Sequence, residues 1–132
     1  RTVLVLTHEV FGDADNVTGP WWFLDWFGYL GIDPSNNGWS YHRELGWISI
    51  GSNSTRDNAW IYLGGSSIRG WFWASDDYLS RMGGLLEGYL YLVPDDGSAA
   101  AWHYVMVDSS AGSSTYGRAY LYDFVSGSWN LP

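Results

Sequence analysis

The sequence contains no cysteine and no lysine, and both absences limit what the chain can do. Without cysteine there is neither a disulfide framework nor a thiolate metal site. All six cationic side chains are arginine, and the 14 carboxylates bring the formal net charge to −8. Nucleic acids and anionic membrane surfaces attract clusters of basic residues, so this charge balance argues against both as partners.

Long apolar runs are also missing from the sequence. A membrane-spanning helix needs about 20 consecutive apolar residues. The most apolar stretch, residues 21–32, is shorter and is interrupted by Asp25, Gly28 and Gly31. We therefore expect no membrane span. The first residue is Arg1 rather than methionine, which favours a product whose leader has been removed, or a fragment of a longer chain.

Aromatic residues, in contrast, are abundant, with 10 Trp, 10 Tyr and 5 Phe. A small residue, an aromatic, any residue and a second aromatic recur in that order. Examples are GWSY (38–41), AWIY (59–62), GWFW (70–73), GYLY (88–91), AWHY (101–104) and AYLY (119–122). Because side chains alternate between the two faces of a strand, both rings of each segment should share one face.

Turn-forming segments rich in Gly, Ser, Asn and Asp separate these repeats, a pattern typical of hairpins. It predicts an all-β fold, an antiparallel meander of hairpins with a sandwich-like or barrel-like arrangement and at most one short helix. The length is that of one domain, residues 1–132. The helix candidate is residues 75–82, SDDYLSRM, where Ser75 suits an N-cap. Residues 21–32 predict one aromatic strand, or two short strands hinged near Gly28.

The sequence contains no recognisable catalytic or metal-binding set. The three histidines are far apart, and the adjacent carboxylates Asp76–Asp77 and Asp95–Asp96 would point to opposite faces of a strand. Nucleophile elbows, phosphate loops and dinucleotide-binding fingerprints are all missing from the sequence. We therefore expect a protein that is not an enzyme and that binds no cofactor and no metal.

Two N-glycosylation sequons are present, NVT at Asn16 and NST at Asn53. Both lie in predicted loops, where an acceptor asparagine must be accessible. They are candidate glycosylation sites if the source organism has the machinery.

Several aromatic segments follow one another in a characteristic order. They are WFGYLG (26–31), GWSYHRELGWISIGSNSTRDNAWIYLGG (38–65), GWFWASDDYL (70–79), GYLYLVPDDGSAAAWHYV (88–105) and YLYDFVSGSW (120–129). This order resembles an aromatic-rich β segment of secreted bacterial proteins whose function is unassigned. The likeness covers roughly residues 21–132, and the chain departs from the family pattern at WAS (73–75). The resemblance implies an exported, surface-associated β module without a recognised catalytic set.

The favoured interpretation is a non-catalytic structural protein, extracellular or at the cell surface, that self-assembles into a fibre or matrix. Residues 2–11 predict a strand, and residues 1–12 are a candidate for exchange with a second copy, because exposed sheet edges accept strands readily. Pairing of this strand within its own sheet is the alternative. The candidate assembly interface comprises Val3, Leu4, Val5, Leu6, Val10, Phe11, Trp21, Trp22, Phe23, Trp26 and Phe27.

The second interpretation is a carbohydrate-binding module in which flat rings stack on sugar faces. Trp39, Trp47 and Trp71 are the candidate stacking residues, and the partner would be a cell-surface polysaccharide. A small glycosidase is less favoured, because that reaction needs a pair of facing carboxylates and none stands out.

Overall fold

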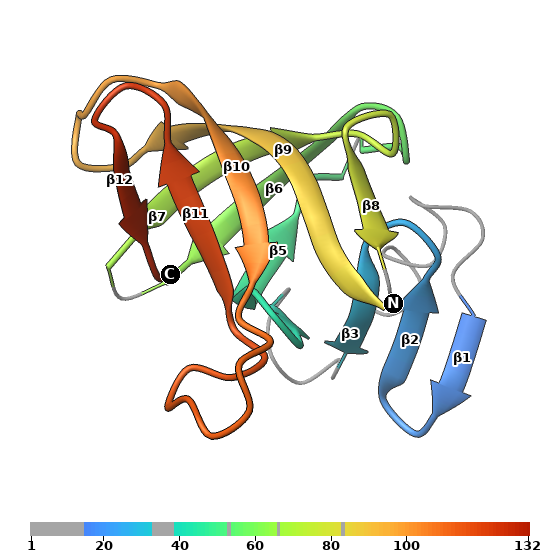
Figure 1. The fold of residues 1–132 in the computed structure, drawn as a ribbon. Helices are drawn as coiled ribbons and strands as arrows, with labels where there is room; N and C mark the ends of the chain where they lie inside the picture. Colours follow the sequence, from blue (N-terminus) through green and yellow to red (C-terminus); the bar gives the residue numbers. More distant parts are fainter. Residues whose placement is uncertain (1–14, 33–38, 53, 66, 83) are drawn as a thin grey trace.

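The computed structural model describes residues 15–32, 39–52, 54–65, 67–82 and 84–132. These residues form one open antiparallel sheet (Figure 1). Its strands are β1 (Asp15–Thr18), β2 (Trp21–Leu24), β3 (Gly28–Ile32), β4 (Ser40–His42), β5 (Gly46–Ile50), β6 (Ala59–Gly64), β7 (Arg69–Ala74), β8 (Leu79–Met82), β9 (Leu85–Pro94), β10 (Ala101–Val107), β11 (Ala119–Asp123) and β12 (Ser128–Asn130). The predicted all-β meander is confirmed. The described residues contain no helix, and so none that could cross a membrane.

Consecutive strands are neighbours in the sheet, except that β7 pairs with β9 and not with β8. Strand β9 is 10 residues long, and its two halves have different partners along the same edge. Its first half pairs with β8, where Gly88 lies opposite Leu79. Its second half pairs with β7, where Tyr91 lies opposite Trp73. β7 and β8 therefore lie end to end along one edge of β9, and the turn between them joins the two.

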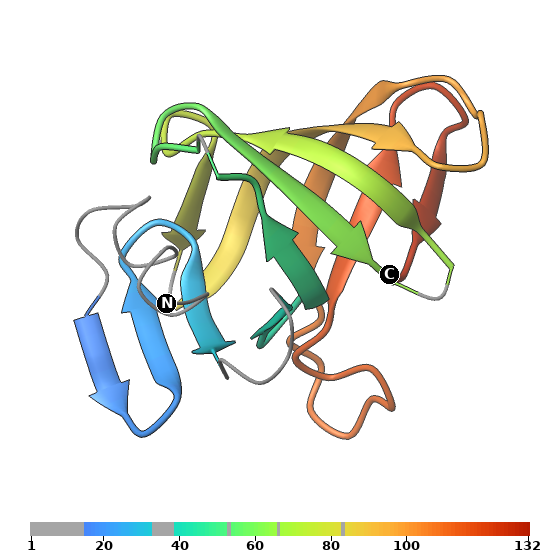
Figure 2. The same ribbon diagram turned by 180° about the vertical axis from the view of Figure 1, so that it is seen from behind.

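The sheet is strongly curled, with β9, β10 and β11 on one side and β5, β6 and β7 on the other (Figures 1 and 2). Contacts outside the strand ladders hold this curvature. The N–H of Ala119 donates to the carbonyl of Glu44 in the β4–β5 turn at 2.9 Å. Arg118 Nη2 donates to the carbonyl of Pro132 at 3.0 Å, and Pro132 packs against Gly65 at the end of β6.

The concave face holds the core. Its largest fully buried side chains are Phe27, Phe72, Leu24, Leu30, Leu45, Ile48, Ile61, Leu63, Leu79, Leu86, Leu90 and Leu92. Each such side chain contributes about 1.5–3 kcal/mol relative to an exposed one. Trp26 is also buried. Trp26 and Phe27 therefore belong to the core of this chain, and these two members of the predicted assembly interface offer little surface to a second copy.

Residues 21–32 fold as two short strands, which was one of the two expectations for this stretch. The N–H of Phe27 donates to the carbonyl of Leu24 at 3.3 Å and closes the turn between β2 and β3. Gly28 follows the turn with φ of +110°, a conformation that side chains with a Cβ rarely adopt. The predicted hinge near Gly28 is therefore present.

The helix candidate at residues 75–82 is wrong. Ser75 does begin a turn, because its Oγ accepts the N–H of Asp77 at 3.1 Å, and its carbonyl accepts those of Tyr78 and Leu79 at 3.0 and 2.9 Å. The chain then continues as β8, where Leu79 is fully buried and the backbone pairs with β9. Burial of Leu79 and the ladder to β9 outweigh the local capping signal, which produces only one turn.

Candidate functional site

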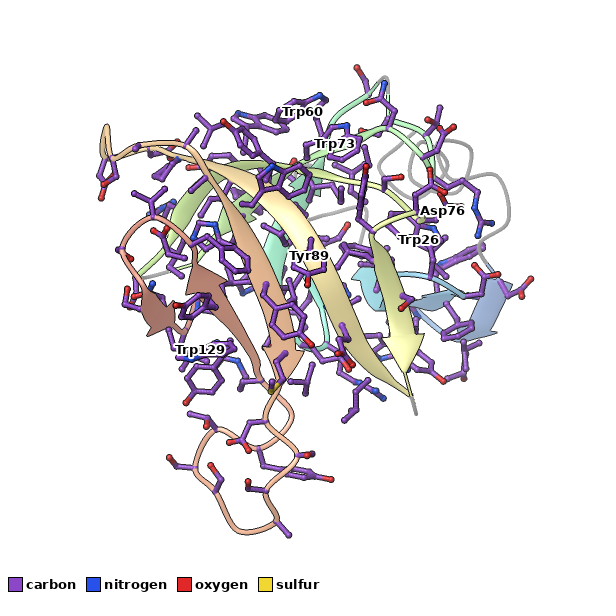
Figure 3. The ribbon with its side chains drawn as sticks, turned by 45° about the horizontal axis from the view of Figure 1, so that its top comes forward. Trp26, Trp60, Trp73, Asp76, Tyr89 and Trp129 are labelled. Carbon is purple, nitrogen blue, oxygen red and sulfur yellow. The ribbon has the colours of Figure 1, made fainter. Side chains whose placement is uncertain are left out.

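The aromatic rings of the repeats lie on the convex face of the sheet. In β6, Ile61 and Leu63 face the core, whereas Trp60 and Tyr62 point outward. The strand register aligns such rings in rows. One row consists of Trp60, Trp73, Tyr91 and Trp102. A second row consists of Tyr89, Tyr104, Tyr122 and Trp129. Figure 3 shows members of both rows spread over the outer surface.

Polar contacts and ring packing fix the orientation of these side chains. The hydroxyl groups of Tyr62 and Tyr104 donate to the carboxylates of Asp95 and Glu87. The hydrogen bond to Glu87 raises the pKa of Tyr104 to about 12. Most neighbouring rings meet at steep angles, as between Tyr62 and Trp71, whose planes differ by 68° at a centroid distance of 5.5 Å; Tyr89 and Phe124, at 27°, are stacked. The ring planes are therefore inclined to one another, and the rings do not form one flat surface.

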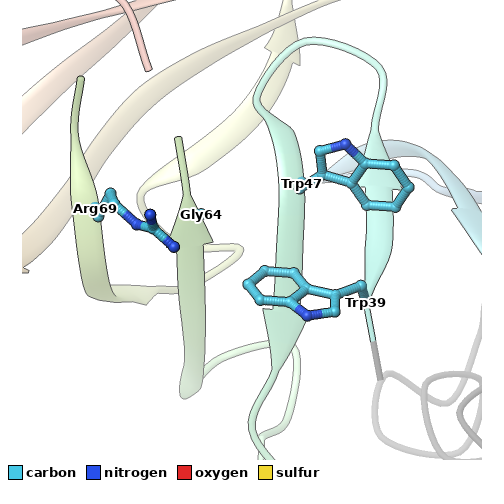
Figure 4. A pocket seen from close by; sticks show the side chains of 4 residues that line it. All are labelled: Trp39, Trp47, Gly64 and Arg69. Atoms are coloured by element: carbon cyan, nitrogen blue, oxygen red, sulfur yellow. The ribbon is translucent and has the colours of Figure 1, made fainter. Parts of the chain in front are cut away.

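One hollow of about 300 Å³ in the convex face has aromatic walls and, among the residues that the structure describes, one cation; we call it the Trp39 cleft. It is lined by Trp39, Trp47, Gly64 and Arg69 (Figure 4). A methyl group at Gly64 would lie 2.8 Å from Cζ3 of Trp39, so the indole lies against the sheet only because this residue is glycine. The cleft thus combines a flat apolar surface with the guanidinium of Arg69.

The structure brings together two of the three predicted stacking residues. Trp39 and Trp47 share the cleft, whereas Trp71 lies in a neighbouring hollow of about 590 Å³. Tyr62 connects the two hollows, with its ring centroid 5.9 Å from that of Trp39 and 5.5 Å from that of Trp71. Sequence reasoning missed Gly64 and Arg69, because Gly64 resembles an ordinary turn glycine and Arg69 carries no motif.

The predicted assembly and glycosylation residues have mixed positions. In β2, Trp22 packs against the core, and Trp21 lies over Gly31, where a methyl group would be 3.3 Å from the indole. Phe23 is partly exposed. The prediction that Asn16 lies in a loop is wrong: it is an exposed residue of strand β1, which pairs with β2, and its Nδ2 donates to the carbonyl of Trp21 at 3.1 Å. The remaining candidates lie outside the described residues: Val3, Leu4, Val5, Leu6, Val10, Phe11 and Asn53.

A polar cluster is buried where β3, β8 and the β4–β5 turn meet. His42 Nδ1 accepts the N–H groups of Glu44 and Leu45, both at 3.1 Å, and Nε2 donates to the carbonyl of Phe27 at 2.6 Å. Burial lowers the pKa of His42 to about 4 and raises that of Glu44. The backbone occupies both ring nitrogens, so His42 has a structural role. No group of three or more His, Asp or Glu within the described part of the chain is placed to hold a metal ion.

A third hollow, of about 580 Å³, opens where the β6–β7, β9–β10 and β11–β12 connections meet, and we call it the His103 pocket. The latter two connections lie close together at the upper left of Figure 1. His103 and Asp123 are directly opposite in the register of β10 and β11, with Nε2 and Oδ2 3.8 Å apart. Arg69 lines this pocket as well as the Trp39 cleft, so the two sites adjoin.

No protein-family model, curated protein or solved structure matches this chain significantly. The resemblance to an aromatic-rich segment of secreted bacterial proteins therefore stays a prediction. Any function has to be inferred from the geometry of the sites.

Proposed function

We propose that this protein is a non-catalytic carbohydrate-binding module, extracellular or at the cell surface, that binds a polysaccharide in the Trp39 cleft. The observation that carries the proposal is the indole of Trp39, held against Gly64 beside Trp47 and Arg69. A sugar ring presents C–H groups on its faces and hydroxyl groups around its edge. Small-ligand sites are typically clefts with aromatic walls and a few fixed polar groups, which suits such a ring.

The fixed rings around the cleft support the same function. Tyr62 contacts Trp39 and is itself tethered to Asp95. Side chains that are already ordered lose little conformational entropy when a ligand binds, so more of the contact energy appears as affinity. Large exposed aromatic patches on a soluble protein usually mark an interaction site.

Replacement of Trp39 by alanine tests the proposal. We expect Trp39→Ala to weaken binding to the best ligand of a polysaccharide panel by about 30-fold, because removal of a central aromatic contact costs about 2 kcal/mol. Gly64→Ala should also weaken binding, since the added methyl group displaces the indole. Trp129→Ala is the matched control, because Trp129 is a half-exposed indole on the convex face that lies outside the cleft. Isothermal titration and tryptophan fluorescence measure the affinities.

The proposal fails if no polysaccharide of the panel changes the tryptophan fluorescence. It also fails if Trp39→Ala and Trp129→Ala bind equally well.

The second candidate function is self-assembly, and it is favoured by the position of β1. This strand ends the sheet, all four of its residues are exposed, and within the described residues it pairs only with β2. Such an edge can accept a strand from another copy. Cryo-electron microscopy at low micromolar concentration should then show regular polymers of the full chain and none of a chain lacking residues 1–12. Equal assembly of the two chains would contradict strand exchange.

A further inference from the structure

The His103 pocket contains a buried acceptor that the neighbouring groups leave unused. His103 is only 3% exposed, and its Nδ1 lies 3.1 Å from the carbonyl oxygen of Ala101. Because a carbonyl can only accept, Nδ1 donates this hydrogen bond, and in the neutral form of the ring Nε2 keeps its lone pair. Within the described residues Nε2 makes no hydrogen bond, and it lies 3.8 Å from Asp123 Oδ2.

Asp123 adds a second acceptor at the same place. Its Oδ1 accepts the backbone N–H groups of Val125 and Ser126 at 2.8 and 3.2 Å, which leaves Oδ2 to face His103. Burial opposes ionisation of this carboxyl, but the N–H groups of Val125 and Ser126 and, when the ring is protonated, the charge of His103 hold its pKa below the usual value, so it is charged at neutral pH. Two acceptors this close repel each other, and a group with several N–H or O–H bonds placed between them can donate to both.

The charge of the pocket decides which donor it favours. Three carboxylates, those of Asp95, Asp96 and Asp123, line the pocket together with one guanidinium, that of Arg69. Hydrogen bonds from the side chain and the backbone N–H of Ser98 lower the pKa of Asp96. The pocket is therefore negatively charged at neutral pH. A cationic donor gains more here than a neutral hydroxyl group, and an anion is repelled.

The pocket also adjoins the aromatic site. Arg69 lines both, and Tyr62, which touches Trp39, donates to Asp95 of the pocket. His103 alternates with Trp102 and Tyr104 and therefore faces the concave side, so a ligand that spans the two sites must pass Arg69 at the start of β7. Such a ligand must offer a ring that stacks on an indole and, in a neighbouring unit, an amino group. A glycan that contains amino sugars with free amino groups has both features.

We propose that the His103 pocket binds the ammonium group of an amino sugar, with His103 Nε2 and Asp123 Oδ2 as acceptors. It would form a second subsite next to the Trp39 cleft. This inference rests on the proposed function, because a neighbouring sugar of the same glycan would occupy the cleft.

The test compares a trimer of glucosamine with a trimer of N-acetylglucosamine, its neutral counterpart, by isothermal titration at one pH and ionic strength. We expect the unmodified protein to bind the glucosamine trimer at least 10-fold more tightly, about 1.4 kcal/mol. In Asp123→Asn this preference should disappear, because the amide removes the charge and can donate to His103. The amide oxygen can still accept the N–H groups of Val125 and Ser126, so the turn should be kept. Asp77→Asn is the matched control, since Asp77 is an exposed carboxylate outside the pocket.

The outcomes separate this inference from the proposed function. Loss of preference in Asp123→Asn, together with weaker binding of both trimers to Trp39→Ala, supports both. Equal binding of the two trimers to the unmodified protein, or a preference that persists in Asp123→Asn, overturns the amino-sugar subsite even if Trp39→Ala is impaired. Should Asp123→Asn fail to fold, Asp96→Asn at the exposed rim must reduce the preference, and an unchanged preference there overturns the inference.

Discussion

Acid should destabilise this protein through one buried ring, that of His42. Both of its nitrogens are engaged by backbone groups, and Nδ1 accepts two N–H groups. Protonation of Nδ1 would break both hydrogen bonds and place a charge in a fully buried site near the guanidinium groups of Arg43 and Arg81. Burial, with a smaller contribution from those two charges, therefore lowers the pKa of His42 from 6.5 to about 4.

The difference in the pKa of His42 between the folded and unfolded protein sets how the free energy of unfolding changes with pH. Between pH 6.5 and 4 the unfolded chain binds a proton at His42 that the folded protein does not, so the free energy of unfolding decreases as the pH falls through this window. The gap between the two pKa values corresponds to about 3 kcal/mol at 1.36 kcal/mol per unit. Glu44 acts in the opposite direction, because burial raises its pKa and ionisation in the folded protein is then unfavourable.

A comparison with His42→Gln isolates the histidine. Glutamine can donate to the carbonyl of Phe27 and accept a backbone N–H, but it does not titrate. Urea unfolding followed by tryptophan fluorescence, repeated between pH 7.5 and 4, gives the free energy of unfolding of both proteins. The unmodified protein should lose about 3 kcal/mol more than the variant over this range. Parallel pH profiles, or a folded-state His42 that titrates near 6.5 by NMR, would refute the reasoning, since Glu44 and the surface carboxylates are common to both proteins.

Further predictions concern the backbone, the core and the longest loop. Gly70→Ala should abolish folding, because the new Cβ would collide with the carbonyl oxygen of Val93. Gly97→Ala, also at a positive φ but with open space around it, should cost only about 1 kcal/mol in urea unfolding. Phe72→Ala should cost about 3–5 kcal/mol through the cavity that it leaves in the core. Hydrogen bonds from loop hydroxyl and N–H groups lower the pKa of Asp108 to about 2, so Asp108→Asn should speed proteolysis within residues 109–117 while the global unfolding transition stays in place.

Most of the strands could be predicted from the sequence, but the pattern predicts a loop at the residues of β1 and a helix at those of β8. The alternation in AWIY (59–62) and GWFW (70–73) gives the observed pairs of rings on one face, and the breakers between repeats mark the observed turns. The segment at 75–82 shows the limit of such reasoning. Its N-cap and acidic residues describe a helix start, but the pairing of β8 with the first half of β9 depends on a hairpin that no local pattern specifies.

The site could be predicted only in part, because it depends on register. Trp39 and Trp47 are recognisable as stacking residues, yet their contact with Gly64 and Arg69 requires strands β4 to β7 to be aligned as they are. His103 and Asp123 face each other in the observed register of β10 and β11. The connection between these strands is long enough to allow other registers, so the sequence alone does not predict this pair. A shift by one residue would move one of the two side chains to the opposite face.

The sequence also could not show which face of the sheet carries the rings. Alternation puts Trp60 and Tyr62 on one face of β6 and Ile61 and Leu63 on the other. Because both pairs are hydrophobic, the sequence does not show which face is buried. In the folded sheet Ile61 and Leu63 face the buried concave side, and Trp60 and Tyr62 face outward. The outward rings then pack against one another across strands, and each such contact is worth about 0.5–1.5 kcal/mol beyond the area that it buries. The aromatic surface is therefore ordered in the free protein, which is consistent with the proposed carbohydrate-binding function.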